Sequence, residues 1–289
     1  MDLEYVTTLP APPVRDEESH KGTYGRVLIV AGSRGMAGAA SLTGLGALRG
    51  GAGLVYLAVP AGVANVVSAV EPSYLVQPIG EDSDGRMVSD LRDEPLATLL
   101  DGKDALAVGP GLGRSRAVSK LVARLYTKFP APAVFDADAL NALATTPKSM
   151  AKPGGPRILT PHPGEFARLI DGDVKGVQAD RENLAVTFAA RHGVILLLKG
   201  HRTIVTDGKR LFVNETGNSG MATGGCGDVL TGLITALLAQ KMEPFEATQF
   251  AAHLHGLAGD LAAQELSRPG LIASDVALYL AKAWMRMGL

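Results

Sequence analysis

Short apolar runs that end in glycine or a polar residue recur along the chain and predict the strands of a buried sheet. Most of these runs are apolar at nearly every position, which is typical of parallel strands covered on both faces. The expected strands are residues 26–31, 54–59, 74–78 at an edge, 105–108, 133–135, 157–159 and 194–198. Each delivers a polar or glycine-rich loop, such as residues 199–208, at its carboxyl end. In an open parallel sheet that edge is where ligands bind.

The segments between these strands have the length and apolar spacing of crossover helices. The expected helices are residues 39–53, 61–70, 91–100, 115–129 and 229–240, and the first is rich in small residues that permit close packing. Strands that alternate with helices predict an α/β fold, with a central, mostly parallel sheet between helical layers. Because no internal stretch has the composition of a linker, we expect residues 1–289 to form a single domain.

Residues 1–24 differ from the rest of the chain. Pro10, Pro12 and Pro13 oppose regular structure there, so we expect an extended N-terminal arm that lies on the surface or on a neighbouring subunit. The segment is polar and acidic without an apolar core, so it does not resemble a secretory signal.

Charge and cysteine content narrow the class of protein. A formal net charge of −1 offers no basic face for nucleic acid or an anionic membrane, so neither is an expected partner. The single cysteine, Cys226, excludes an internal disulfide framework and fits a reducing compartment. Uncharged apolar runs such as residues 194–198 are too short to span a bilayer. We therefore predict a cytoplasmic protein.

The segment 218–238, NSGMATGGCGDVLTGLITALL, is the strongest candidate for chemistry. Its glycine-rich turn opens an apolar helix, so backbone amides and the positive end of the helix dipole would face a bound anion such as phosphate. Asp228 stands in the first turn, where a carboxylate can deprotonate a hydroxyl that attacks a phosphoryl group. The alternative is that Asp228 only caps a core helix.

The common nucleotide-binding fingerprints are missing. The chain contains no G-x-x-x-x-G-K-[ST], and Gly32, Gly35 and Gly38 after the first strand do not have the G-x-G-x-x-G spacing. A P-loop enzyme and an ordinary dinucleotide-binding dehydrogenase are therefore disfavoured.

A late phosphate loop combined with the early AGS…GAA segment resembles the ribokinase-like superfamily, which implies a three-layer α/β/α sandwich. Within it the chain resembles the ADP- or ATP-dependent NAD(P)H-hydrate dehydratases, from about His20 to the C-terminal helix. Seven segments in family order carry the resemblance: HKGTYGRVLIVAGS, GAASLTGLGALRGGAGLV, VGPGLG, FDADALNAL, LTPHPGEFARL, LLKGHRTIV and NSGMATGGCGDVLTG. One departure is Cys226, where the family usually has threonine, and this puts a hydroxyl contact to phosphate in doubt.

The resemblance implies a repair reaction on a damaged cofactor. Its substrate would be the S epimer of NADH or NADPH hydrate, in which water has added across a ring double bond. Phosphorylation of the ring hydroxyl, with Mg²⁺ and with ADP as the expected donor in place of ATP, would create a leaving group. Elimination of phosphate would then restore NADH or NADPH.

The resemblance also assigns residues. Asp228 would be the catalytic base, and the amides of Gly225, Cys226 and Gly227 would stabilise the transferring phosphoryl group. The adenine nucleotide would be bound by Gly227 together with Lys199, Gly200, His201, Arg202 and Thr203. The hydrated dinucleotide would contact Ala39, Gly111, His162 and Asp228.

Several polar residues have two interpretations. Glu165 is either an ordinary acid in the first turn of a helix or a ligand of Mg²⁺ and water near the phosphates, and we favour the metal role. Asp136 and Asp138 are candidates to cap the following helix, Asp138 more so. His253 and His255 are two residues apart on a helix, so they face different ways and are expected in the core or an interface.

Two rival functions share parts of this pattern. A thiazole or hydroxymethylpyrimidine kinase would use the same loop and base but release a phosphorylated product. A nucleotide-binding regulator would need no carboxylate beside the phosphate. The resemblance further implies a homo-oligomer, a tetramer, and an NAD(P)H-hydrate epimerase on a separate polypeptide.

Overall fold

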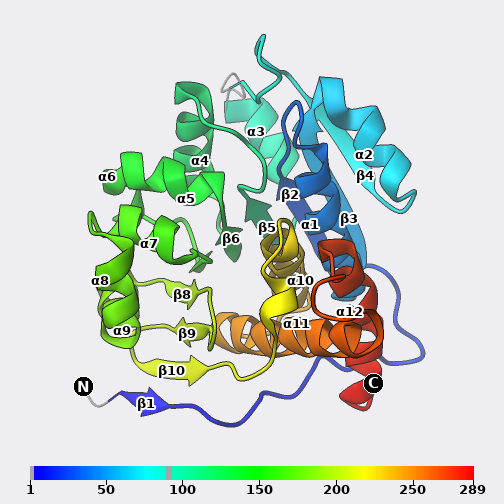
Figure 1. Ribbon diagram of the computed structural model, residues 1–289. Helices are drawn as coiled ribbons and strands as arrows, with labels where there is room; N and C mark the ends of the chain where they lie inside the picture. The colour runs from blue at the N-terminus through cyan, green and yellow to red at the C-terminus, as the bar shows by residue number, and fades with distance from the viewer. Residues whose placement is uncertain (1–2, 89–92) are drawn as a thin grey trace.

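Residues 3–88 and 93–289 are described by a computed structural model, and their strands form one sheet (Figure 1). The strand order is β1-β10-β9-β8-β7-β6-β5-β2-β3-β4. Neighbouring strands pair in parallel except where β9 meets β8 and β10. The strands are β1 Glu4–Tyr5, β2 Arg26–Val30, β3 Leu54–Pro60, β4 Leu75–Ile79, β5 Ala105–Val108, β6 Ala133–Phe135, β7 Arg157–Leu159, β8 Ile195–Leu198, β9 Ile204–Thr206 and β10 Arg210–Val213.

Helices cover both faces of the sheet. They are α1 Ala37–Arg49, α2 Ala64–Val70, α3 Asp93–Leu100, α4 Arg116–Lys128, α5 Asp138–Thr145, α6 Pro147–Met150, α7 Pro163–Leu169, α8 Val174–Ala179, α9 Arg181–His192, α10 Cys226–Ala239, α11 Pro244–Leu266 and α12 Ala273–Arg286, with the short 3₁₀ helices η1 Ala61–Val63 and η2 Ser219–Met221. In Figure 1 the green helices α4 to α9 lie apart from the yellow-to-red helices α10 to α12.

The core is divided by the sheet into two apolar clusters. Along β2, Val27 and Ile29 pack on one side with residues of α1, α10, α11 and α12. Leu28 and Val30 between them pack on the other side with residues of α4, α5, α7 and α9. Because side chains alternate along a strand, a run that is apolar at every position is buried on both faces. The expected three-layer α/β/α sandwich is confirmed.

Two glycines let α1 and α10 touch through their backbones. A Cβ on Gly46 of α1 would lie 2.1 Å from the carbonyl oxygen of Val229, and one on Gly232 of α10 would lie 1.9 Å from that of Thr43. No side chain fits at either place. The small residues expected in the first crossover helix therefore bring α10, and the loop that opens it, directly against α1.

The expected strands all form, with ends shifted by at most one residue. The first helix is shorter than expected, because it ends at Arg49 and the chain turns at Gly51, whose φ is +91°. The prediction of a plain loop at 199–208 is wrong: this segment contains β9, which pairs antiparallel with β8 through Leu197 and Val205. Of the helix expected at 91–100, residues 91–92 lie outside the described residues and α3 covers the remainder.

The N-terminal arm lies along its own chain. It begins with β1, which pairs in parallel with β10, and Gln249 of α11 then donates a hydrogen bond to the carbonyl oxygen of Thr8. Figure 1 shows this blue segment passing β10 and running beneath α11. In the described parts of the chain, every helix is too short or too polar to cross a membrane.

Candidate active site

The glycine-rich loop becomes a helix at Cys226. Gly225 precedes the helix with a φ of +96°, a left-handed conformation that glycine adopts without strain. A Cβ there would lie 2.5 Å from Leu42 of α1 and 2.9 Å from Ala273 of α12. The first amides of a helix have no partner within it, so those of Cys226, Gly227 and Asp228 are available to an anion.

A buried ion pair lies beside this helix start. Asp136 follows β6 and is 1% exposed, while Lys199 follows β8. The ammonium group of Lys199 donates to Oδ1 of Asp136 at 2.8 Å, and the hydroxyl of Thr231 on α10 donates to Oδ2 at 2.8 Å. A Cβ on Gly227 would lie 3.2 Å from Nζ of Lys199, so the pair borders the first turn of α10. Asp136 therefore connects β6, β8 and α10.

Asp228 has the electrostatics of a base. Burial raises the pKa of its carboxyl to about 7, and the nearby charge of Asp136 acts in the same direction while Lys199 opposes it. Burial by itself would lower the pKa of Lys199, but Asp136 and Glu165 hold it above its ordinary value. At neutral pH the lysine is thus charged, whereas the pKa of Asp228 is raised towards neutrality, which suits a carboxylate that accepts a proton.

His162 and Glu165 form the start of α7. The backbone N–H of His162 donates to Oε2 of Glu165 at 2.9 Å, and Nδ1 of His162 accepts from the N–H of Gly164 at 3.0 Å. Nε2 then lies 3.4 Å from Oε1 of Glu165, and burial lowers the pKa of the imidazole. Glu165 thus has the capping role that we considered for it, while its second oxygen lies at the ring of His162.

The metal role of Glu165 stays a prediction. Among residues 3–88 and 93–289, no three His, Cys, Asp or Glu side chains are grouped so that they could hold a metal ion. Oε2 of Glu165 is 3.9 Å from Nζ of Lys199. Mg²⁺ that accompanies a nucleotide is commonly held by one or two carboxylates together with phosphates and water. One carboxylate at this position is compatible with that mode.

A cavity of about 670 Å³ opens beside the ion pair and is called the larger cavity below. Its wall includes every member of the expected nucleotide set except Gly225, namely Lys199, Gly200, His201, Arg202, Thr203, Cys226 and Gly227. The remaining wall comes from His162, the segments 214–219 and 221–223, and Leu230, Ala252, His255 and Gly256. Loops that follow β7, β8 and β10 therefore meet the start of α10 at one cavity.

His255 supports the turn from inside. Its Nε2 lies 2.9 Å from the carbonyl oxygen of Cys226, and burial lowers the pKa of the imidazole to about 4. The ring is therefore neutral and donates to that carbonyl. Burial also raises the pKa of the Cys226 thiol to about 11, which argues against a nucleophilic role.

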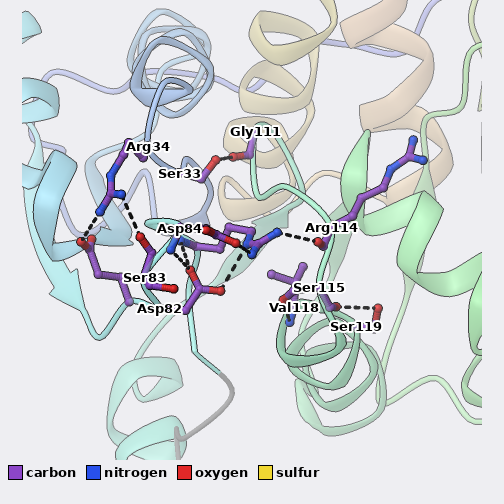
Figure 2. Close-up of polar contacts among 12 residues, drawn as sticks. Ser33, Arg34, Asp82, Ser83, Asp84, Gly111, Arg114, Ser115, Val118 and Ser119 are labelled. Carbon is purple, nitrogen blue, oxygen red and sulfur yellow. Dashed lines mark hydrogen bonds and ion pairs between the residues drawn. The ribbon is translucent and has the colours of Figure 1, made fainter.

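The remaining predicted substrate residues meet at a second place. Gly111 has a φ of +64°, and a Cβ on it would lie 2.9 Å from Cβ of Ala39 on α1. The hydroxyl of Ser33 donates to the carbonyl oxygen of Gly111 at 2.7 Å (Figure 2). His162, the third of these predicted substrate residues, lines the larger cavity.

The segment 80–88 braces this second place. Arg86 donates to the carbonyl oxygen of Arg114 at 3.1 Å and pairs with Asp82 and Asp84 (Figure 2). Arg34 donates to the carbonyl oxygen of Ser83 at 2.9 Å. The loops after β2 and β5 are therefore both tied to this segment, and its own carboxylates neutralise the charge of Arg86.

Comparison with known proteins decides the family. The sequence profile of the NAD(P)H-hydrate dehydratases matches residues 27–282. The chain belongs to the NAD(P)H-hydrate dehydratase family. It is 38% identical to the ADP-dependent (S)-NAD(P)H-hydrate dehydratase of Bacillus subtilis, over 95% of this chain and 94% of that protein. It is also 44% identical to a bifunctional NAD(P)H-hydrate repair enzyme of Moorella thermoacetica, over 93% of this chain. This match covers 51% of that relative, so the chain spans about half of its length.

Solved structures agree with this family. A crystal structure of the Bacillus subtilis ADP/ATP-dependent NAD(P)H-hydrate dehydratase, co-crystallised with ATP and Mg²⁺, has a TM-score of 0.82 at 36% identity, covering 95% of this chain and 94% of that one. The ribokinase of Thermotoga maritima has a TM-score of 0.52 at 14% identity, covering 88% of this chain and 99% of that one. That second likeness concerns the fold alone, and it confirms the ribokinase-like architecture of the NAD(P)H-hydrate dehydratase chain.

Two aspartates of this dehydratase-family chain differ from the capping role considered for them. The carboxylate of Asp136 binds Lys199 and Thr231, and that of Asp138 accepts the backbone N–H of Gly113 at 2.9 Å. These bonds to Lys199, Thr231 and Gly113 reach other parts of the fold, so neither carboxylate caps the backbone of α5. The sequence did contain a signal for these roles: both aspartates closely follow a buried strand, and such positions lie at the edge of a parallel sheet where ligands usually bind.

Proposed function

We propose that the chain dehydrates the S epimer of NADH or NADPH hydrate, using ADP or ATP as phosphoryl donor, with residues 1–289 acting as one catalytic domain. The observation that carries this proposal is the position of Asp228. Its helix start borders the larger cavity on one side and packs, through α1, near the Ala39–Gly111 contact on the other. A base between a donor chamber and an acceptor site is what phosphoryl transfer to a hydroxyl requires.

The donor nucleotide is assigned to the larger cavity. Residues 199–203 and Gly227 would surround it, and the amides of Gly225, Cys226 and Gly227 would face the transferring phosphoryl group. The ammonium group of Lys199, held by Asp136, adds a fixed positive charge at the same wall. Glu165 is the carboxylate that would help hold Mg²⁺, and the ion supplies charge neutralisation on the phosphates.

The acceptor is the hydrated ring of the dinucleotide, next to Ala39 and Gly111 and within reach of His162. Asp228 takes the proton of the ring hydroxyl as its oxygen bonds to phosphorus, and AMP leaves when ADP is the donor. The carbon–oxygen bond then breaks, phosphate departs with the bonding electrons, and the neighbouring ring carbon loses a proton to re-form the double bond. Because Gly111 lacks a Cβ, its loop packs directly against Ala39 of α1 beside the proposed acceptor site.

The reaction itself provides the test. Incubating the chain with Mg²⁺, ADP or ATP, and hydrated NADH should restore the near-ultraviolet absorbance of the dihydronicotinamide ring, with one phosphate released per NADH. Omitting the nucleotide should abolish the recovery, and parallel reactions identify the preferred donor, which we expect to be ADP. A stable phosphorylated product without recovered absorbance would support the rival small-molecule kinase. Nucleotide binding without turnover would support the rival regulator.

The partners follow from the same assignment. The chain would act in the cytoplasm as a homotetramer, without nucleic acid or membrane as a partner. An NAD(P)H-hydrate epimerase outside residues 1–289 would supply the S epimer. The name of the Moorella thermoacetica relative, a bifunctional repair enzyme of about twice this length, supports such a partnership.

A further inference from the structure

A second cavity, of about 400 Å³, lies between α4, α5 and α7 and is called the smaller cavity. Its polar lining includes Arg114, Ser119, Asp138, Asn141, Arg168 and Asp171. In the described part of the chain it shares no lining residue with the larger cavity. The two cavities lie at the carboxyl ends of different strands.

A continuous line of polar contacts forms one wall of the smaller cavity. Asp138 accepts the N–H of Gly113 at 2.9 Å with one oxygen and the amide of Asn141 at 3.3 Å with the other. Nε of Arg168 donates to Oδ1 of Asn141 at 2.9 Å. The wall joins the loop after β5 to α5 and α7, so its side chains are held in place before any ligand arrives.

The charges of this wall are mixed. Nε of Arg114 is 3.7 Å from Oδ1 of Asp138, and the side chain of Arg114 is 68% exposed. Figure 2 shows that side chain extending away from Asp82 and Asp84, so its guanidinium does not contact those carboxylates. Two arginines with two aspartates do not suit a bare anion. They suit a ligand that has phosphates for the arginines and hydroxyls for the carboxylates.

The loop 109–113 connects the reaction centre to this cavity. A Cβ on Gly109 would lie 1.8 Å from the carbonyl oxygen of Asp136, and Gly113 is part of the cavity wall. Four residue steps span at most about 14 Å. A dinucleotide whose nicotinamide ring lies at Asp228 and Gly111 must place its second nucleoside at such a distance, and the larger cavity is assigned to the donor.

We propose that the smaller cavity binds the adenosine end of the dinucleotide substrate. Asp138 and Asn141 hydrogen-bond the ribose of the adenosine, and Arg114 and Arg168 face the phosphate on the adenosine side, which a nicotinamide mononucleotide lacks. This inference rests on the proposed function, because it assumes that the substrate is a hydrated dinucleotide.

The test compares two substrates that share the reacting ring. Hydrated NADH has the adenosine end, whereas hydrated reduced nicotinamide mononucleotide lacks it. Arg168→Met should lower kcat/KM for hydrated NADH about tenfold, the equivalent of one charge-assisted hydrogen bond at 1.4 kcal/mol per factor of ten. It should leave kcat/KM for the mononucleotide hydrate unchanged. Ala144→Leu, which fills the cavity without removing a charge, should show the same pattern.

Two controls accompany these variants. Arg191→Met removes an exposed arginine of α9 that lines neither cavity, so it should affect neither substrate. The Kd of ADP, measured by calorimetry, should be the same in all variants because the larger cavity is intact.

The outcomes separate this proposal from the proposed function. If the cavity variants lower kcat/KM equally for both substrates, the adenosine site is wrong although the dehydration reaction stands. An unchanged kcat/KM for hydrated NADH in both cavity variants would also show that the adenosine site is wrong. If the unaltered chain turns over neither hydrate, the proposed function is wrong and this inference falls with it.

Discussion

At the scale of single residues, the site depends on how three carboxylates share one lysine. Asp136 receives the hydrogen bond from Lys199, Glu165 lies 3.9 Å from the same ammonium group, and Asp228 is the third. Because one positive charge does not balance three negative ones in a partly buried site, one carboxylate has to favour its protonated form. Burial and the charge of Asp136 make Asp228 that carboxylate, with a pKa raised to about 7.

The first prediction concerns Asp228→Asn. This substitution preserves shape and removes the base, so turnover should fall by roughly 10²–10⁴-fold, the range of a general base. The Kd of ADP should change little, since the larger cavity keeps its wall. Steady-state kinetics and calorimetry check both statements, and near-normal turnover with normal ADP binding would exclude Asp228 as the base.

The second prediction concerns pH. Asp228 must be ionised to act, so kcat/KM should rise with pH through about 7. The charged and titratable groups that influence it are Asp136, Lys199, Glu165 and Asp138. Asp136→Asn removes the nearest like charge and should move this rise to lower pH. A pH profile with the rise at the same place would show that Asp136 acts only in structure.

The same pKa has a consequence for stability. The folded chain keeps a proton on Asp228 between the ordinary carboxyl pKa of 3.8 and about 7, where the unfolded chain has released it. For this group the free energy of unfolding therefore falls as pH rises through that window and is constant above it. Asp228→Asn removes the buried carboxylate and with it this loss of stability at high pH. Its melting temperature should exceed that of the unaltered chain by more at pH 8 than at pH 4, and thermal unfolding at both pH values tests this.

The fourth prediction concerns Lys199→Ala. Since Lys199 lines the larger cavity, its loss should raise the Kd of ADP more than the Kd of the hydrated dinucleotide. The variant also leaves Asp136 buried without its counter-charge, so the ratio of the two Kd values is the informative quantity. Separate calorimetric titrations provide it, and an equal loss for both ligands would make the lysine structural.

At the scale of elements, the contact between α1 and α10 positions the start of α10. Gly232→Ala would place a Cβ 1.9 Å from the carbonyl oxygen of Thr43, so the helices would have to separate. We expect a loss of about 1–3 kcal/mol in the free energy of unfolding, as for other overpacked cores. Gly38→Ala in α1 is the matched control, because a Cβ there meets nothing within 4 Å. Urea unfolding should give a lower free energy of unfolding for Gly232→Ala than for Gly38→Ala. Equal values for the two variants would contradict the close contact between α1 and α10.

The elements also show where sequence patterns were sufficient. Short runs of apolar residues identified β2, β3 and β5 to β8, because a strand buried on both faces is apolar at most positions. The partly exposed edge strand β4 was also expected, at residues 74–78. β9 was missed because Ile204–Thr206 is short and follows a polar segment. Its pairing with β8 and β10 is a non-local contact, which no local pattern encodes.

At the scale of the whole molecule, both cavities and the start of α10 with Asp228 lie at the carboxyl edge of the sheet. Loops after β5, β6, β7 and β8 all contribute. Because the proposed ADP site exists only where these loops converge, ADP should stabilise the folded chain. At one hundred times its Kd, ADP should raise the free energy of unfolding by about 2.7 kcal/mol. Thermal unfolding with and without ADP measures this, and Lys199→Ala should show a smaller gain at the same concentration.

The sequence by itself determined the layers of the sandwich, the sheet edge at which polar and glycine-rich loops gather, and the glycine-rich start of α10. These features depend on local periodicity, on glycine, and on the rule that parallel strands share one carboxyl edge. Only the tertiary structure decided that Asp136 meets Lys199, 63 residues away, and Thr231, 95 residues away. It also decided the raised pKa of Asp228 and the wall that Asp138 builds with Gly113. Such features depend on burial and distance between loops, which exist only once the sheet has brought the strand ends together.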